Sequence, residues 1–249
     1  MNSRALRFLA TIGIAAALLA ASGAQAVELL ANGDFESGVF PPSWTVFDQP
    51  GGYGSWYIDT PGTTTPASGF TTALNPGGGA FYAVSDQTGQ GAHALIQTFS
   101  VPGPAASVIL SFEMFVNDWS GLGPIIDSAG LDYTALPNQH GRVDILTALA
   151  GPLSTAPADV IANLYLGVDP GTPPNVYTPY VFDITPFVGA GGTFQLRFAE
   201  VDNQGFFNMG VDNVSISYTA SSEVIPEPTN LALLALGGLG LLRRRRRAA

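Results

Sequence analysis

The sequence predicts an all-β protein, an antiparallel β-sandwich of jelly-roll type. Its apolar segments are short, rich in β-branched and aromatic residues, and separated by Gly, Pro, Asn and Asp. Several alternate: TFQLRFAEV (193–201) places Phe194, Leu196 and Phe198 on one face and polar residues such as Arg197 on the other. No long segment with a helical period lies between the two chain ends, and the many Gly and Pro residues there disfavour helices.

The first 26 residues have the pattern of a secretory signal peptide. Arg4 and Arg7 precede the apolar run LATIGIAAALLA, and ASGAQA ends in small residues at Ala24 and Ala26. A membrane anchor is the alternative, but the run is shorter than the roughly 20 residues that a span requires. We therefore expect export through the Sec machinery, cleavage by signal peptidase, and a mature chain that begins at Val27.

The body between the two ends is strongly acidic. Between 27 and 225 only Arg142 and Arg197 are basic, against eighteen acidic residues, so this segment carries a formal charge of −16 compared with −10 for the whole chain. Such a surface repels phosphate backbones, which excludes nucleic acid as a partner, and it favours divalent cations. The chain has no cysteine, so disulfides and cysteine-based metal or thiol chemistry are excluded.

Eleven segments are the expected strands of one domain, residues 27–219. They are 27–31, 43–47, 55–59, 80–84, 93–101, 107–118, 142–149, 160–167, 180–184, 193–201 and 211–219. Each is expected to have one polar face. Two stretches, 62–79 and 119–141, are long irregular loops, which in a compact domain are usually functional or partly disordered.

Two motifs mark the ends of this domain. ELLANGDFESG (28–38) opens it and VDNVSISY (211–218) closes it. The pair resembles the first and last strands of the galactose-binding-like β-sandwich, the fold of many carbohydrate-binding modules. The resemblance covers roughly 27–219, but its motifs are confined to the two ends.

This resemblance implies a structural calcium ion where the two ends meet. Glu36 and Asp212 would supply carboxylates, Asp34 lies on the same strand face as Glu36, and Asn32 would add a carbonyl. Such ligands would join the first strand to the last, where a domain otherwise frays. The alternative is that Asp34 and Asn213 are turn formers and Glu36 is a solvated charge.

Signatures of catalysis are absent from the sequence. His93 and His140 belong to no HExxH-type spacing, there is no G-x-S-x-G elbow, and the glycines at 77–79 do not lead into a helix. Each histidine is expected to be a surface or packing residue. We therefore expect a protein that is not an enzyme.

Two carboxylate pairs keep a glycan-acting hydrolase as the third hypothesis. Glu113 lies near Asp118, and Glu200 near Asp202, and a glycosidase needs two carboxyls a few ångströms apart. Eighteen acidic residues make such adjacency common by chance.

Aromatic residues in or beside loops indicate a surface that binds sugars. Sugar rings stack on flat aromatic faces, while amide and carboxylate groups bind the hydroxyls. Trp44 and Trp56 are expected in the core instead. The expected ligand-binding residues are Trp119, Asn117, Asp118, Phe206 and Phe207.

The chain ends in VIPEPTNLALLALGGLGLLRRRRRAA, which has three parts. Pro226 and Pro228 lack amide donors, so the stretch around Glu227 is extended. The fourteen residues 229–242 are uncharged and would cover about 21 Å as a helix, less than the roughly 30 Å of a hydrocarbon core. The arginines that follow would keep that end in the cytoplasm and leave the body outside. They are Arg243, Arg244, Arg245, Arg246 and Arg247.

These three parts, in this order, closely resemble the PEP-CTERM sorting signal. The resemblance implies a Gram-negative-type bacterium, an exosortase membrane protease as partner, and release or attachment at the cell surface beside exopolysaccharide or biofilm matrix. The expected organisation is a signal peptide (1–26), the sandwich (27–219), a linker (220–225) and the sorting signal (226–249), with a helix in each terminal segment.

Together these features predict an exported, surface-sorted β-sandwich that binds extracellular polysaccharide and is stabilised by Ca²⁺. The rival hypothesis is a structural matrix or adhesion protein without a discrete ligand.

Overall fold

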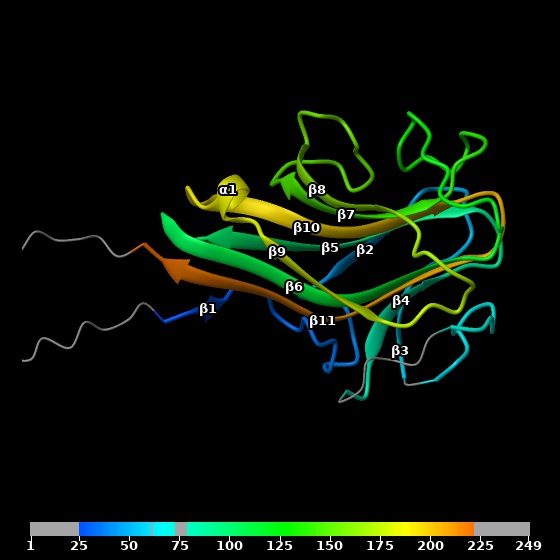
Figure 1. Ribbon diagram of the computed structural model, residues 1–249, viewed down its shortest axis with the longest axis horizontal. Coiled ribbons are helices and arrows are strands. Elements are labelled where there is room, and N and C mark those ends of the chain that lie inside the picture. Colours follow the sequence, from blue (N-terminus) through cyan, green and yellow to red (C-terminus); the bar gives the residue numbers. More distant parts are fainter. Residues whose placement is uncertain (1–24, 61, 73–78, 222–249) are drawn as a thin grey trace, which may run out of the picture.

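The computed structural model describes residues 25–60, 62–72 and 79–221 (Figure 1). The signal peptide, the sorting motif Pro226-Glu227-Pro228, the arginines 243–247 and both predicted terminal helices lie outside these residues. Within the described chain, no helix has the length and apolar character that crossing a membrane requires.

Each of the eleven predicted strands is present. The strands are β1 (Val27–Glu28), β2 (Thr45–Asp48), β3 (Ser55–Asp59), β4 (Tyr82–Asp86), β5 (Gly91–Val101), β6 (Ala105–Asp118), β7 (His140–Thr147), β8 (Val160–Gly167), β9 (Thr178–Asp183), β10 (Gly192–Asp202) and β11 (Phe207–Ala220). The helix of the described body, α1 (Thr185–Val188), is a single turn between β9 and β10, which agrees with the absence of a long segment with a helical period. Pro186 is compatible with that turn, since proline is tolerated where helices begin.

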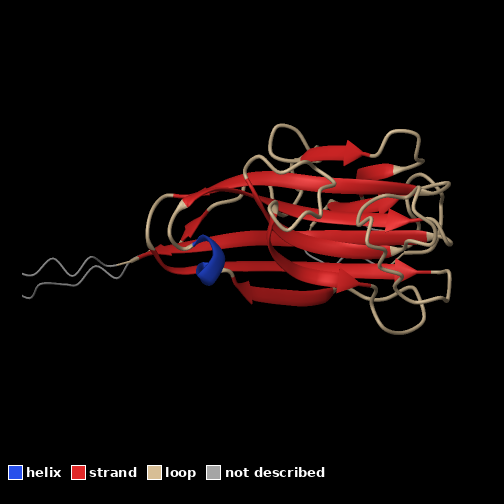
Figure 2. Ribbon diagram, turned by 90° about the horizontal axis from the view of Figure 1, so that it is seen from above, coloured by secondary structure: helices blue, strands red, loops and turns tan. Residues whose placement is uncertain are grey.

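The strands form two antiparallel sheets that pack face to face (Figures 1 and 2). One has the order β3-β4-β11-β6-β9, with β1 paired to β11, and the other has the order β2-β5-β10-β7-β8. Among the described strands, β3–β4 and β7–β8 are the consecutive pairs within one sheet, and every other connection crosses between the sheets. This confirms the prediction of an antiparallel β-sandwich.

The main hydrophobic core lies between the sheets. Trp44, Phe112 and Phe198 are at most 2% exposed, and the ring of Phe198 lies 6.2 Å from Trp44 and 5.1 Å from Phe112. Trp56 is also buried. The prediction that both tryptophans are core residues is confirmed.

The second sheet is buried on its outer face as well, so the expectation of one polar face per strand was wrong there. Leu131 and Tyr133 from the loop 119–139 pack on small side chains of β5 and β10. Arg197, expected on the polar face of β10, is fully buried and donates to the Asp144 carboxylate. The long loop therefore covers the sheet as a structural layer.

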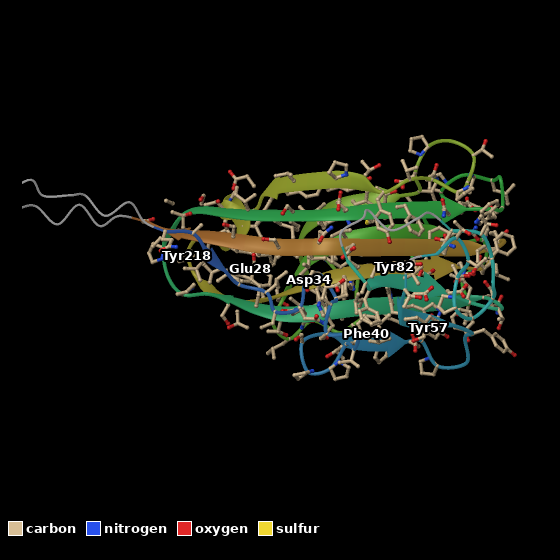
Figure 3. All side chains as sticks on the ribbon, turned by 90° about the horizontal axis from the view of Figure 1, so that it is seen from below. Glu28, Asp34, Phe40, Tyr57, Tyr82 and Tyr218 are labelled. Atoms are coloured by element: carbon tan, nitrogen blue, oxygen red, sulfur yellow. The ribbon has the colours of Figure 1, made fainter. Side chains whose placement is uncertain are left out.

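The two ends of the described chain lie at the same end of the sandwich (Figure 1). Val27 and Glu28 pair with Tyr218 and Ser217, near the end of the last strand. In Figure 3, Tyr218 and Glu28 lie at this end, whereas Tyr57 lies near the other. The connections β4–β5 and β10–β11 are at that other end, which we call the loop end.

Candidate functional site

A cavity of about 570 Å³ opens at the loop end. Three segments line it: Ala67 and Ser68, the β4–β5 turn (87–90), and the β10–β11 turn (202–206). Two of these segments directly follow strands of opposite sheets, so the sandwich itself fixes their positions.

Asp86, at the end of β4, fixes the segment that contains Ala67 and Ser68. Its Oδ2 accepts the backbone N–H groups of Ala67 (2.6 Å) and Ser68 (2.7 Å), and its Oδ1 accepts the Ser68 hydroxyl (2.7 Å). A buried carboxylate with several donors is a strong local anchor. The segment 62–72 is thereby held against the cavity.

Three aromatic rings lie together beside the cavity, and of these Phe206 is among its lining residues. Phe70 stacks on Phe206 with ring centroids 3.8 Å apart, and it meets Trp119 edge-on at 5.0 Å. The Trp119 backbone N–H donates to the Phe206 carbonyl (2.9 Å). Phe70 is 39% exposed. We call Phe70, Trp119 and Phe206 the aromatic rim.

The polar side of the cavity contains a buried amide without a partner. Gln87 is 2% exposed, and neither its Oε1 nor its Nε2 meets hydrogen-bond geometry with any described residue. Asn203 also lines the cavity, but its Nδ2 donates to the carbonyls of Tyr133 (2.7 Å) and Ala135 (2.6 Å). Gln87, which lies beside Asp202 and lowers its pKa, and the exposed Gln90 are therefore the lining amides available to a ligand.

Asp202 belongs both to the cavity wall and to a buried polar group. In the part of the chain that the structure describes, one group of three side chains could hold a metal ion: His93, Glu200 and Asp202, whose ligand atoms lie within 4.8 Å of one another. Burial raises the pKa of Asp202 to about 8. Burial and the neighbouring Asp202 raise the pKa of Glu200 well above its usual range.

The structure separates the predicted ligand-binding residues. Trp119 and Phe206 belong to the rim. Phe207 is fully buried in the core, and Asn117 is fully buried with its Nδ2 donating to Asn208 and its Oδ1 accepting the Asn175 N–H. Phe207 faces the core between the sheets, whereas Asn117 lies with Asn208 on the opposite face of its sheet, where the segment around Asn175 covers it. Neither is among the residues that line the cavity, and their role in binding stays a prediction.

Asp118, the remaining predicted ligand-binding residue, is buried but only partly hydrogen-bonded. Its Oδ1 accepts Ser120 N–H (2.8 Å) and Gln139 Nε2 (2.6 Å), so it holds the start of the long loop. Its Oδ2 is buried without a partner among the described residues. A direct role in binding stays a prediction.

The predicted calcium ligands lie where the first loop meets β11. The chain turns at Asn32 (φ 53°), so β1 is shorter than predicted, and Val214 N–H donates to the Gly33 carbonyl (2.8 Å). A shallow cavity of about 360 Å³ is lined there by Asn32, Asp34 and neighbouring residues. Glu36 turns aside, and its Oε1 accepts the N–H groups of residues 80 and 81.

Asp212 is the most buried member of this set. Burial raises its pKa to about 7, and the negative charges of Glu113, Glu36 and Asp34 act in the same direction. Excess negative charge near a carboxylate is what a cation would relieve. The four predicted ligands are neighbours but not a preformed cage, since they do not bring three carboxylates within 4.8 Å. Calcium binding stays a prediction.

Fold and cavity together define a β-sandwich with a concave, partly aromatic site at one end of its sheets. No protein-family model matches the chain, and no curated protein matches it. It is similar to the solved structure of TmCBM61 in complex with β-1,4-galactotriose, with 10% identity and a TM-score of 0.45 over 76% of this chain and 97% of that one.

Two further solved structures are similar to this chain to a comparable degree. The enzymatically active domain of tailspike protein 4 of bacteriophage CBA120 has 11% identity and a TM-score of 0.45 over 77% of this chain, which spans only 21% of that one. A family 11 carbohydrate-binding module from a Clostridium thermocellum cellulase has 12% identity and a TM-score of 0.38 over 79% and 98% of the two chains. At this level the likenesses carry no conclusion about what this chain binds.

Proposed function

We propose that this protein is a non-enzymatic, surface-sorted β-sandwich that binds extracellular polysaccharide in the cavity at its loop end. One observation supports the proposal: a cavity of about 570 Å³ is lined by the buried amide of Gln87 and by Phe206, on which the exposed ring of Phe70 stacks. Sugars present flat apolar faces and many hydroxyls, and this pair of features fits both.

The aromatic rim would supply the stacking surface. Phe70 is the exposed ring, while Phe206 supports one of its faces and Trp119 its edge. A ring fixed by two neighbours loses little conformational entropy when a ligand binds. Gln87 would then exchange hydrogen bonds with hydroxyl groups, which also relieves the cost of its unpartnered burial.

Binding is favoured over hydrolysis by the placement of the two acids. Glu200 and Asp202 do converge, as a glycosidase pair would, but of the two only Asp202 lines the cavity. Glu200 is fully buried behind it. A glycosidase needs both carboxyls beside the scissile bond, and here one carboxyl reaches the ligand.

Export and sorting are proposed from the sequence pattern at the two chain ends. The signal-like residues 1–26 and the Pro-Glu-Pro, apolar and arginine segments of 226–249 support export and recognition by an exosortase. Crossing of the chain between the sheets supports a jelly-roll, galactose-binding-like body. Mass spectrometry of the native C-terminus tests the sorting proposal, which predicts that Arg243–Arg247 are absent.

Calcium at the junction of the first loop and β11 is also part of the proposal. The charge gathered around Asp212 supports it. We expect Ca²⁺ to raise the melting temperature of protein stripped with chelator, and Asp34→Asn with Asp212→Asn to abolish that rise. An equal rise in the double variant would contradict the site.

Binding to a glycan array, followed by calorimetry on each hit, tests the ligand proposal. Phe70→Ala and Gln87→Leu should each weaken binding at least about tenfold, equivalent to about 1.4 kcal/mol. Phe187→Ala is the matched control, because Phe187 is a similarly exposed phenylalanine (46%) on α1, away from the loop end. Trp119→Ala should have a smaller effect, since its ring acts through Phe70.

Three results would decide against this function. Absence of binding to every glycan favours the structural matrix or adhesion protein. Binding that Phe70→Ala and Gln87→Leu leave unchanged moves the site elsewhere. Release of reducing sugar from a bound glycan, lost in Asp202→Asn, restores the hydrolase hypothesis.

A further inference from the structure

We propose that His93, Glu200 and Asp202 form a binding site for a transition-type divalent cation, of the class of Zn²⁺ or Mn²⁺, behind the wall of the loop-end cavity. The site is distinct from the calcium junction, and the inference does not depend on glycan binding. It lies between the two sheets, where the hydrophobic core gives way to polar residues.

The β-sheet register brings the three residues together. Glu200 on β10 is paired with His93 on β5, and Asp202 is paired with Gly91. Their side chains share the inward face of each strand, as shown by the burial of Phe198 and Leu95 on the same faces in the core. One imidazole nitrogen and two carboxylates form a donor set that suits Zn²⁺ and Mn²⁺ better than Ca²⁺, which takes oxygen ligands.

Glu200 gives the first sign of a missing ligand. It is fully buried, and neither of its carboxylate oxygens meets hydrogen-bond geometry with any described residue. The Ser85 hydroxyl lies close enough to lower the pKa of Glu200, but one neutral donor is little compensation for a fully buried carboxylate, which is usually paired, hydrogen-bonded or bound to a metal. A dication bound to Glu200 and Asp202 would neutralise both charges.

His93 has an acceptor beside each of its two ring nitrogens. Its Nδ1 lies 2.7 Å from Asp48 Oδ1, and its Nε2 lies 3.1 Å from the Tyr53 carbonyl oxygen. A neutral imidazole that donates from Nδ1 has a lone pair on Nε2, which then faces the lone pairs of the carbonyl. A doubly protonated ring satisfies both acceptors, and a metal ion bound at Nε2 would take the place of the second ring proton.

Asp48 and Gly91 complete the arrangement. A carboxylate that accepts the other ring N–H is the usual outer partner of a histidine bound to metal. Residue 91 is glycine at a place where a Cβ would collide with His93 Nε2 and lie 2.8 Å from the Tyr53 carbonyl oxygen. The space beside Nε2 therefore exists because residue 91 has no side chain.

The distances allow direct coordination after small adjustments. With metal–ligand bonds of about 2.1 Å, the ligand atoms of a tetrahedral site are about 3.4 Å apart. The three side chains already place one atom each within 4.8 Å of the others. Binding would require these side chains to close the remaining distance, with His93 Nε2 giving up its contact with the Tyr53 carbonyl.

Titration of the purified, chelator-stripped protein with Zn²⁺ alone, by calorimetry and thermal melting, tests the proposal. One Zn²⁺ per chain should bind, and the melting temperature should rise. Glu200→Gln and His93→Asn should weaken Zn²⁺ binding at least about 100-fold, and Asp48→Asn, which removes the outer partner, about 10- to 100-fold. Mn²⁺ serves as a second probe.

Matched control variants show whether Zn²⁺ binds at this site or elsewhere on the protein. Asp183→Asn, at an exposed carboxylate elsewhere, and Asp212→Asn, at the calcium junction, should bind Zn²⁺ as the parent does. Glu200→Gln keeps the shape of the side chain and an oxygen that can accept the Ser85 hydroxyl, and so should fold even if His93→Asn does not. Failure of both Zn²⁺ and Mn²⁺ to bind, or Zn²⁺ affinity unchanged in Glu200→Gln, would overturn the proposal and leave a proton shared by the two carboxyls as the neutralising charge.

Discussion

Asp144 is a fully buried carboxylate held by the only two arginines of the sandwich. Arg142 donates to both of its oxygens (2.7 Å each), and Arg197 donates Nη2 to Oδ2 (2.6 Å). Arg197 also donates to the carbonyls of Pro152 and Ser154. The two arginines lower the pKa of Asp144 although its burial acts to raise it.

Removal of one partner from this group should therefore be strongly destabilising. We expect Arg197→Met to reduce the free energy of unfolding by about 3–5 kcal/mol, because Asp144 stays buried with part of its pairing lost. Replacing all three residues with apolar ones (Arg142→Met, Asp144→Leu, Arg197→Met) should have a smaller effect. Urea unfolding measures both, and a triple variant less stable than Arg197→Met would contradict this account.

His140 predicts a pH dependence that can be isolated by one substitution. Burial lowers its pKa from 6.5 to about 4, with Arg142 acting in the same direction and the Ile125 carbonyl and Asp144 in the opposite one. The unfolded chain binds a proton below about pH 6.5, whereas the folded chain does so only near pH 4. The stabilising contribution of neutral His140 is thus complete above pH 6.5 and is lost as the pH falls towards 4.

His140→Gln removes this titration and leaves the neighbouring charges in place. The parent should lose roughly 2–3 kcal/mol of stability relative to the variant between pH 7 and pH 4.5. Urea unfolding of both proteins at the two pH values gives this difference directly. Parallel pH profiles would show that His140 is not held neutral by the fold.

At the scale of elements, the strands were predictable and their surroundings were not. Period-two alternation and Gly, Pro, Asn and Asp boundaries identified all eleven strands. Arg197 was placed on the correct face but not as a buried residue, because its cover comes from loops distant in sequence. The alternation of residues along a strand indicates which side chains share a face of the sheet. It does not indicate which distant segments pack on that face.

The residues of the candidate site were also predictable only in part. Trp119 and Phe206 could be named from the sequence, since aromatic residues in loops suggest ligand contacts. Phe70 and Gln87 were missed, because stacking on Phe206 and an unpartnered buried amide are consequences of tertiary contacts. The long loop 62–79, noted as irregular, was the one available signal for Phe70.

The junction between the first loop and β11 depends on one glycine. A Cβ on Gly33 would collide with the Val214 carbonyl group, on the strand to which Gly33 is hydrogen-bonded. We expect Gly33→Ala to reduce stability by about 2 kcal/mol or more, a size typical of overpacking against backbone. Gly103→Ala is the control, since a Cβ there meets no atom within 4 Å. Equal unfolding free energies for the two variants, measured in urea, would contradict the close approach.

At the scale of the whole molecule, the two ends of the sandwich differ: one holds the ends of the described chain and the other holds the cavity. Val27 and Ala220 lie at one end, and β11 runs the length of the sandwich to Phe207 beside the cavity (Figure 1). Fourteen residues of antiparallel strand span about 45 Å. A tether at the C-terminus would therefore present the cavity on the side away from the attachment point, towards the surrounding matrix.

Under the proposed function, charge over the whole molecule predicts which polysaccharides would bind. Arg142 and Arg197 are the only basic residues between 27 and 225 apart from the histidines, and both are buried against Asp144, so the surface carries a large excess of carboxylates. Neutral glycans should bind with an affinity that changes little between about 50 and 500 mM NaCl, whereas uronate or sulfated glycans should be rejected most strongly at low salt. Calorimetry in the presence of chelator measures this without cation bridges. Tighter binding of an acidic polysaccharide at low salt would show that the ligand does not meet this acidic surface.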